Sequence, residues 1–360
     1  MSDVIDETAV SLLATGASFL GTGGGGDPRI GELMARAAIR EHGPVELRSI
    51  EDVRDDDLVV PVAMIGAPTV ILERIPGGHE FELVLSSLGQ HLGREVTCVM
   101  PIEAGGLNST VPFIVAARRG LPVVDGDGMG RAFPEVQMVT LGAGGVDAWP
   151  LVLADESGAT VTIDGCGDNA TAERLARATV VAMGGSAVAT HYAATGDRIR
   201  EWAVPGSVRL ALEIGRALDE VARHGGDALA ALGDVCGARR DFTGKIVDVD
   251  RRTEAGFVRG TFHIEGIDGD RGSRAEVEFQ NENLVLVVDG EFVTAVPDLL
   301  TLVDAESGYP LTTEGARFGA RVHVVSTPAS DLWWRPEALP FVEPRAFGYD
   351  IEPLRMKVSG

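Results

Sequence analysis

Apolar residues with helical spacing dominate the start of the chain. They predict a helix over residues 7–20, with Asp6 placed to cap its first turn, and a second helix over residues 28–43. Between these segments lies the stretch GTGGGGDP, residues 21–28, which is the densest run of glycines in the chain. The chain therefore begins with a helix, a glycine-rich loop and another helix.

Strands and helices alternate from residue 45 onward. Strands are predicted over residues 45–48, 58–65, 96–103 and 121–128, and helices over residues 78–93 and 104–120. Most of these strands are continuously apolar, which is typical of a parallel sheet with helices on both faces. Residues 150–165 are predicted to add a hairpin that closes or extends the sheet. This pattern indicates the α/β class.

The pattern changes after about residue 240, where short alternating segments are separated by Gly and Asp turns. Strands are predicted over residues 243–250, 257–264, 275–280, 282–290 and 321–326. Two helices, over residues 168–184 and 206–224, precede this β unit. We predict an α/β N-terminal domain, residues 1–165, and a β-rich C-terminal domain, residues 166–360, with the two helices at its start.

Composition narrows the class of partner. The formal net charge of −23 disfavours nucleic acid and anionic membrane surfaces, which bind through Lys and Arg. No apolar stretch approaches the roughly 18 residues of a membrane span, and the N-terminus lacks the basic segment of a secretory signal. The three cysteines have no spacing typical of disulfide frameworks or Cys-rich zinc sites. We therefore expect a cytoplasmic protein.

The glycine run is the first candidate site. Gly21, Gly23 and Gly26 satisfy G-x-G-x-x-G, but a dinucleotide-binding loop needs a strand before it, and here a helix precedes it. Consecutive glycines can direct their N–H groups into one concavity, and a helix start follows at once, so we predict an anion-binding nest. Its candidate substrate-binding residues are Thr22, Gly23, Gly24, Gly25, Gly26 and Asp27. Asp27 is also a good N-cap for the following helix.

The second candidate is PIEAGGLNS, residues 101–109, which follows an apolar strand and opens a helix. Ligands of parallel α/β sheets bind beyond the carboxyl ends of the strands, where Glu103 is expected. Gly105 and Gly106 allow a close approach of the backbone, and Asn108 is a polar residue of the first helical turn. The alternative is a helix-capping arrangement. We take Glu103 as a candidate catalytic residue and Asn108 as a substrate-binding residue.

The third candidate is DGDGMGRAFPE, residues 125–135, after the next strand. Asp125 and Asp127 could act as bases or bind a divalent metal through oxygen, and Arg131 and Glu135 follow as substrate-binding candidates. The alternative is a purely structural turn. Because two consecutive strand ends carry acids and glycines, we expect residues 21–28, 103–109 and 125–135 to meet in one cleft.

Other chemistry has weaker support. No histidine pair has metal-binding spacing, and neither a G-x-S-x-G elbow nor a Walker A loop occurs. Cys166 lies between glycines before a helix, which is compatible with a nucleophile, although a small buried residue is the simpler interpretation. Near the C-terminus, Trp333, Trp334, Arg345 and Tyr349 suit interdomain packing better than an oligomer interface.

Seven motifs resemble a known bacterial family over residues 8–352. They are GTGGGGDP, EAGGLNS, VDGDGMGRAFPE, NENL, PDLLTLVD, PLTTEGARFG and PRAFGYD. This order is similar to that of the S-methyl thiohydantoin desulfurase family, often described as hydantoinase/oxoprolinase-associated. The resemblance implies a Rossmann-like N-terminal domain and a β-rich C-terminal domain. It also implies chemistry on a five-membered cyclic ureide or its sulfur analogue. Such a compound is therefore the expected small-molecule partner. We further expect a homo-oligomer.

For the activity that gives the family its name, the resemblance implies that water attacks the ring carbon bearing the S-methyl group. Methanethiol leaves and a hydantoin with a propionate side chain remains, as in breakdown of S-methylated ergothioneine-type compounds. Such a reaction needs a base, for which Asp127 or Glu103 is the candidate, and a second carboxyl as acid. Arg131 or the glycine nest would hold the substrate carboxylate. No redox cofactor is required, and a divalent metal stays possible.

Two alternatives remain open at this point. The chain could be a non-catalytic partner or regulator of a hydantoinase-type enzyme, binding a small anion through the glycine nest. The less favoured alternative is a nucleotide-binding oxidoreductase.

Overall fold

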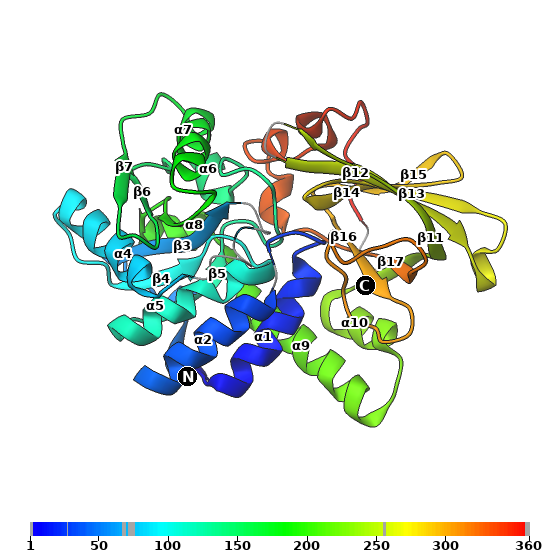
Figure 1. Ribbon diagram of the computed structural model, residues 1–360, viewed down its shortest axis with the longest axis horizontal. Coiled ribbons are helices and arrows are strands. Elements are labelled where there is room, and N and C mark those ends of the chain that lie inside the picture. The colour runs from blue at the N-terminus through cyan, green and yellow to red at the C-terminus, as the bar shows by residue number, and fades with distance from the viewer. Residues whose placement is uncertain (1–2, 27, 67–69, 71–75, 255–256, 357–360) are drawn as a thin grey trace.

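The computed structural model describes the whole chain except residues 1–2, 27, 67–69, 71–75, 255–256 and 357–360. It is a mixed α/β protein with two sheets (Figure 1). One sheet contains parallel strands and is flanked by helices, and the other is antiparallel. The α/β class and the β-rich C-terminal part agree with the expectation from the sequence.

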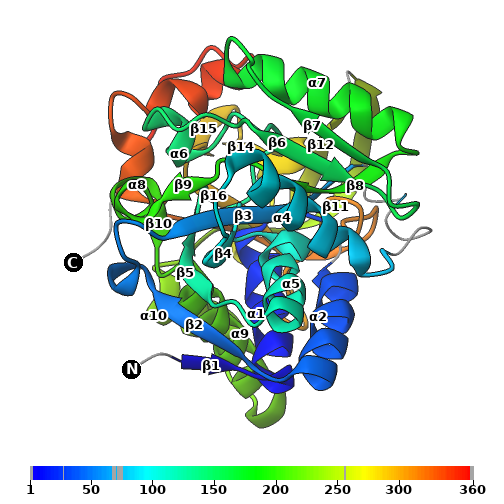
Figure 2. The same cartoon turned by 90° about the vertical axis from the view of Figure 1, so that its left-hand side faces the viewer.

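The strands of the first sheet follow the order β1-β2-β5-β4-β3-β8-β6-β7, which Figure 2 shows from below upward. Their bounds are β1 Asp3–Ile5, β2 Val45–Ser49, β3 Leu58–Gly66, β4 Cys98–Pro101, β5 Val123–Asp127, β6 Leu151–Ala154, β7 Thr160–Ile163 and β8 Ser186–Thr190. Short strands β9 (Ala194–Thr195) and β10 (Val204–Pro205) pair with β3 and β5.

Parallel pairing joins β2 to β5, β5 to β4 and β4 to β3. Beyond β3 the pairing becomes antiparallel, first to β8 and then through β6 to β7. The predicted hairpin of residues 150–165 is thus β6–β7, at one edge of the sheet. A Rossmann-like build is not confirmed, since the parallel pairing is limited to these central strands.

Helices pack against the first sheet (Figure 2), and some of them belong to the second half of the chain. Their bounds are α1 Glu7–Leu20, α2 Pro28–His42, α4 His79–Leu92, α5 Val111–Arg119, α6 Thr140–Ala143, α7 Asn169–Ala182, α8 Gly196–Trp202, α9 Ser207–His224 and α10 Ala228–Cys236. Asp6 caps α1 as predicted, since its carboxylate accepts from the N–H groups of Thr8 and Ala9 at 2.9 and 2.8 Å.

The first sheet draws on residues on both sides of position 165. Strand β8 pairs with β3 and β6, and α9 packs against α1. The two helices assigned to the start of the C-terminal domain, α7 and α9, therefore contact the elements of the N-terminal part. The division at residue 165 stays a prediction, although the antiparallel sheet itself begins only at residue 239.

The second sheet has the order β15-β14-β13-β12-β11-β17-β16. Its strands are β11 Arg239–Glu254, β12 Phe257–Gly266, β13 Arg274–Gln280, β14 Glu282–Val288, β15 Glu291–Ala295, β16 Leu299–Asp304 and β17 Arg321–Thr327. Apolar side chains of alternating residues, such as Phe262, Ile264 and Val277, form its own core. This alternation is the period-2 pattern expected from the sequence.

Helices α1 and α9 approach each other closely because glycines lie at their crossing. A Cβ atom on Gly16 of α1 would lie 1.8 Å from the carbonyl oxygen of Ala211 on α9. A Cβ atom on Gly215 would lie 1.9 Å from the carbonyl oxygen of Leu12. The contact therefore has no room for larger residues at these two positions.

Replacing Gly16 by alanine is expected to destabilise the fold, because α9 would have to move away from α1. Overpacking of this kind costs about 1–3 kcal/mol of the free energy of unfolding, which urea denaturation measures. The control is Gly167→Ala, where a Cβ atom meets nothing within 4 Å and the change should stay within about 0.5 kcal/mol. Equal destabilisation by both variants would contradict the tight crossing.

Candidate functional site

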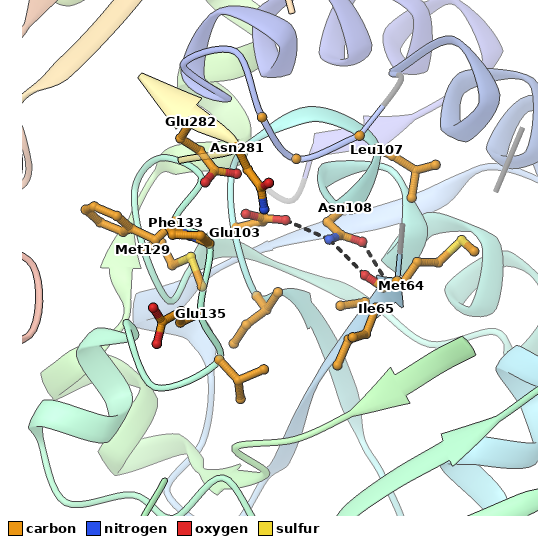
Figure 3. A pocket seen from close by; sticks show the side chains of 18 of the residues that line it. Met64, Ile65, Glu103, Leu107, Asn108, Met129, Phe133, Glu135, Asn281 and Glu282 are labelled. Carbon is orange, nitrogen blue, oxygen red and sulfur yellow. Dashed lines mark hydrogen bonds between the residues drawn. The ribbon is translucent and has the colours of Figure 1, made fainter. Parts of the chain in front are cut away.

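A cavity of about 130 Å³ lies where the two sheets meet. Its wall includes the glycine loop 24–26, Glu103, Asn108 and Glu135 from the first half of the chain, and Asn281 and Glu282 from the second. Figure 3 shows the carboxyl groups of Glu103 and Glu282 and the amide of Asn281 gathered at one side. Met64 and Ile65, at the end of β3, line another side.

The glycine loop packs backbone against backbone on the loop after β4. The Gly25 carbonyl oxygen accepts a hydrogen bond of 2.9 Å from the Leu107 N–H. Gly106 has a φ of 56°, and a Cβ atom on it would lie 2.4 Å from the Gly25 oxygen. Glycine is therefore required here for close approach as well as for conformation. The glycine loop directly follows helix α1, whereas a dinucleotide-binding loop follows a strand.

Glu103 is held at the carboxyl end of β4 by Asn108. The Asn108 Nδ2 donates to Glu103 Oε1 at 2.6 Å and to the Met64 carbonyl oxygen at 3.2 Å, and its Oδ1 accepts from the Met64 N–H at 2.8 Å. Asn108 thus fixes Glu103 relative to β3. Burial raises the pKa of Glu103 to about 8, and the charge of Asp127 adds to this effect.

Glu282 reaches the cavity from the first position of β14. Its side chain is buried, and the preceding residue, Asn281, adopts a φ of 56° at the turn from β13. Burial raises the pKa of Glu282 well above its usual value, and the charge of Glu103 raises it further. The positive charge of Arg131 acts in the opposite direction.

The structure brings part of each predicted loop to this cavity. Gly24, Gly25, Gly26, Glu103, Asn108 and Glu135 line it. The Glu135 carboxylate accepts from the side-chain amides of Gln137 and Gln280. The predicted convergence of the three loops is therefore present in the fold, although the roles given to individual residues stay predictions.

Thr22 and Gly23 lie beside the cavity and join the glycine loop to the second sheet. The Thr22 hydroxyl accepts from Arg131 at 2.8 Å, and the Thr22 carbonyl oxygen accepts from the Asn283 N–H at 2.8 Å. The Gly23 carbonyl oxygen accepts from the Thr313 N–H at 2.8 Å. Asp27 lies outside the described residues.

Asp125, Asp127 and Arg131 are not among the residues that line the cavity. Asp125 forms an ion pair of 2.9 Å with Arg209 on α9. Asp127 Oδ2 accepts from the N–H groups of Met129 and Gly130 at 3.1 and 2.7 Å, which closes a tight turn. Burial raises the pKa of Asp127 to about 7, and its charge acts on Glu103 from behind the cavity wall.

Arg131 is completely buried and bonded to the protein itself. Its guanidinium donates to the carbonyl oxygens of Ala132, Asn283 and Asp298 at 3.0, 2.9 and 2.8 Å, besides the Thr22 hydroxyl. A guanidinium with these partners connects the two halves of the molecule, so this geometry does not support the predicted role in holding a substrate carboxylate.

Sequence reasoning gave no role to several residues that line the cavity. They are Met64, Met129, Arg177, His191, Asn281 and Glu282. The NENL motif, residues 281–284, contains two of them, and an acid between two asparagines at a hairpin turn was the available signal. Burial lowers the pKa of His191 to about 4, so its imidazole is neutral at physiological pH.

Metal ligation and thiol chemistry receive little support from the described part of the chain. There, no group of three or more His, Cys, Asp or Glu side chains is arranged to hold a metal ion. Cys166 is half-buried and does not line the cavity. Burial and the neighbouring Asp164 and Asp168 raise the pKa of its thiol, which is the opposite of an activated nucleophile. Among the described helices, none is both long and apolar enough to cross a membrane.

A larger cavity, of about 530 Å³, lies on the other side of the 127–131 turn. Of the three predicted loops, only Gly130 reaches it. Two acids in its wall, Glu201 and Asp331, form ion pairs with Arg198 and Arg355. Because buried carboxyl groups with shifted pKa values indicate functional sites, we assign the candidate site to the smaller cavity.

Fold and site together define a two-sheet α/β protein with an acid-lined cavity between the sheets. The S-Me-THD-like N-terminal domain matches residues 8–165, and the S-Me-THD-like C-terminal domain matches residues 167–356. The chain therefore belongs to the S-Me-THD-like family, as the seven motifs predicted. The family name indicates a desulfurase-like enzyme.

A solved structure with the same fold is the X-ray crystal structure of a protein from Chromobacterium violaceum. The two structures superpose with a TM-score of 0.83 at 24% sequence identity, over 99% of this chain and 100% of the other. This likeness concerns the fold alone. No curated protein matches the chain.

The raised pKa of Glu103 predicts that stability falls as pH rises. The folded chain binds more protons at this residue than the unfolded chain between the usual pKa of 4.5 and about 8, so the stabilisation present below 4.5 is lost across this window. Glu103→Gln removes the titration. The free energy of unfolding of the variant minus that of wild type should therefore increase by roughly 2–4 kcal/mol from about pH 5 to about pH 8.5.

Urea denaturation of both proteins at the two pH values measures this difference. His191, whose pKa burial lowers to about 4, is present in both proteins, so its loss of stability at acid pH cancels in the comparison. A constant difference between the two proteins at both pH values would show that Glu103 does not titrate in this range.

Proposed function

We propose that this protein is a hydrolase of a five-membered S-methyl thiohydantoin, or of a related hydantoin. In this proposal, water attacks the ring carbon that bears sulfur, methanethiol leaves and a hydantoin remains. The observation that carries the proposal is the buried carboxyl of Glu103, fixed by Asn108 in a small cavity, in a chain of the S-Me-THD-like family.

The size of the cavity supports a small flat ring as substrate. Its volume of about 130 Å³ is close to the roughly 150 Å³ of an engineered protein cavity that binds benzene. Apolar side chains, including Met64, Met129 and Phe133, provide surfaces for a ring and for a methylthio group. The amide groups of Asn108 and Asn281 belong to the same wall and suit the polar edge of a cyclic ureide.

Glu103 is the proposed general base. Its carboxylate would take a proton from the attacking water, and a base works best when its pKa lies near the working pH. The pKa of about 8 meets this condition. The Asn108 amide holds one carboxyl oxygen of Glu103, and the backbone of Phe133 also favours the charged form that a base requires.

Arg177 replaces Arg131 as the proposed contact for an anionic side chain of the substrate. Arg177 lines the cavity, where its guanidinium stacks 4.5 Å from the ring centre of Phe257. Its ion pair with Glu173 holds the guanidinium in place. We also propose a cytoplasmic location, and a place in the breakdown of S-methylated sulfur compounds of the ergothioneine type.

Glu103→Gln is expected to lower methanethiol release by about 10²- to 10⁴-fold, the usual contribution of a general base. The assay incubates the purified chain with an S-methyl thiohydantoin and measures free thiol. The control is Glu80→Gln, which changes a buried carboxylate at the start of α4, outside the cavity, and should keep the wild-type rate. No turnover by the wild-type chain would refute the proposed activity and favour a non-catalytic partner.

A further inference from the structure

A second carboxyl group, that of Glu282, lies in the same cavity as Glu103 but comes from the other sheet. Glu282 is 3% exposed, and its Oε2 has no hydrogen-bond partner among the described residues. Figure 3 shows its carboxyl group beside that of Glu103. A buried polar atom without a protein partner needs an explanation, and in the wall of a cavity a bound molecule is one that fits. The inference drawn from it rests on the proposed function.

The glycine loop provides the seat for this carboxyl group. A Cβ atom on Gly24 would lie 2.0 Å from Glu282 Oε1 and 2.5 Å from its Cδ, so any other residue would displace the acid. The Gly25 N–H group acts on the same carboxyl and favours its charged form. One protein carboxyl therefore occupies the space where an external anion was expected from the sequence.

A purely structural role, as the counter-ion of Arg131, explains less. The two residues interact through their charges, but the hydrogen bonds of the Arg131 guanidinium go to other groups. The guanidinium of Arg131 donates to carbonyl oxygens and to Thr22, and Asp298 supplies a second compensating charge. Arg131 is thus satisfied without a direct bond to Glu282.

We propose that Glu282 is the general acid of this site and protonates the ring nitrogen of the substrate while Glu103 activates water. Two carboxyl groups in one buried site, with their protons held differently, are the usual arrangement for paired acid–base catalysis. The pair combines a residue after β4 with a residue of β14, so each sheet contributes one catalytic group.

The reaction then balances without any other reactant. Glu103 takes a proton from water as the oxygen bonds to the ring carbon, and Glu282 gives a proton to the ring nitrogen as the C=N double bond becomes single. The intermediate carries OH and S-methyl on one carbon. Its collapse breaks the C–S bond, the hydroxyl proton returns to Glu282, and the proton on Glu103 leaves with methanethiol. Both carboxyl groups end in their starting states.

Several charged groups bear on the titration of Glu282. Glu103 faces it directly, and Asp127 acts on Glu103 from behind. The positive charge of Arg131 opposes the effect of Glu103, and Glu135, Glu314, Arg177 and His191 line the same cavity. Glu282 must be protonated and Glu103 ionised for turnover, so kcat/KM should rise through the titration of Glu103 and fall at higher pH as Glu282 loses its proton.

The test compares wild type, Glu282→Gln and Glu282→Asp across pH in the thiol-release assay. Glu282→Gln should lose about 10²- to 10⁴-fold in kcat and should also lose the fall in rate at alkaline pH. Glu282→Asp retains an acid and should keep the alkaline fall with a reduced rate. If the glutamine variant does not fold, the aspartate variant still tests the proposal, since the midpoint of its alkaline fall must differ from that of wild type, and an unchanged midpoint would overturn the acid role.

The control is Asp298→Asn, which removes another buried carboxyl that acts on Arg131 but lies outside the cavity. It should lower the melting temperature while leaving the pH profile unchanged. A second substrate separates the roles further: a ring that is N-alkylated and permanently cationic needs no proton, so Glu282→Gln and wild type should hydrolyse it at similar rates.

Failure of the acid role of Glu282 and failure of the hydrolase activity give different results in these assays. An inactive wild-type chain refutes the hydrolase itself. An active wild type with an unchanged alkaline limb in Glu282→Gln overturns the acid role and leaves the hydrolase standing. Loss of the limb in Asp298→Asn as well would assign the effect to the charge balance of Arg131.

Discussion

The buried guanidinium of Arg131 is the interaction on which the rest of this structure depends. It lies on the turn after β5 and donates hydrogen bonds to the glycine loop, through Thr22, and to carbonyl oxygens at Asn283 and Asp298 in the second half of the chain. Burial lowers its pKa to about 10, so it stays charged at neutral pH. A buried charge is tolerated only with such partners, and these partners position both sheets.

Two buried acids, Glu282 and Asp298, are linked electrostatically to Arg131. The charges of Glu282 and Asp298 oppose the lowering of the Arg131 pKa, and Arg131 in turn opposes the raising of the Glu282 pKa. Glu103 and Asp127 are too buried to ionise as easily as exposed carboxyl groups. The site therefore holds protons at pH values where surface acids have lost them, and it does so without a metal ligand group in the described residues.

Much of the fold could be predicted because its signals are local. The periodicity of residues 7–20 and the apolar run of residues 58–65 correspond to α1 and β3, with ends that agree within a residue or so. Strand β8 was missed because its residues, SAVAT, are small and give a weak strand signal, although Gly184 and Gly185, both at positive φ, form a turn before it. The hairpin β6–β7 was predicted, but the antiparallel pairing of β8 with β3 and β6 was not, since it depends on tertiary contacts.

In the candidate site too, residues with a local sequence signal were predicted, and residues placed by tertiary contacts were not. Glu103 and Asn108 were found because the ends of parallel strands are a local feature with a general use in ligand binding. Glu282 was not assigned a role, because only tertiary contact brings the turn between β13 and β14 to the glycine loop. Arg131 was taken for a ligand contact because the sequence shows a charge and not its burial. The helix–loop–helix context of the glycines was correctly recognised.

The seat between Gly24 and Glu282 has a consequence for how the activity arises during folding. The loop and the acid are separated by more than half of the chain, and each is incomplete alone. A nascent polypeptide that has finished only its first sheet holds Glu103 with no opposing acid. Under the proposed function, the acid–base pair is complete only when the antiparallel sheet packs against the first sheet, so a chain without that contact is expected to be inactive.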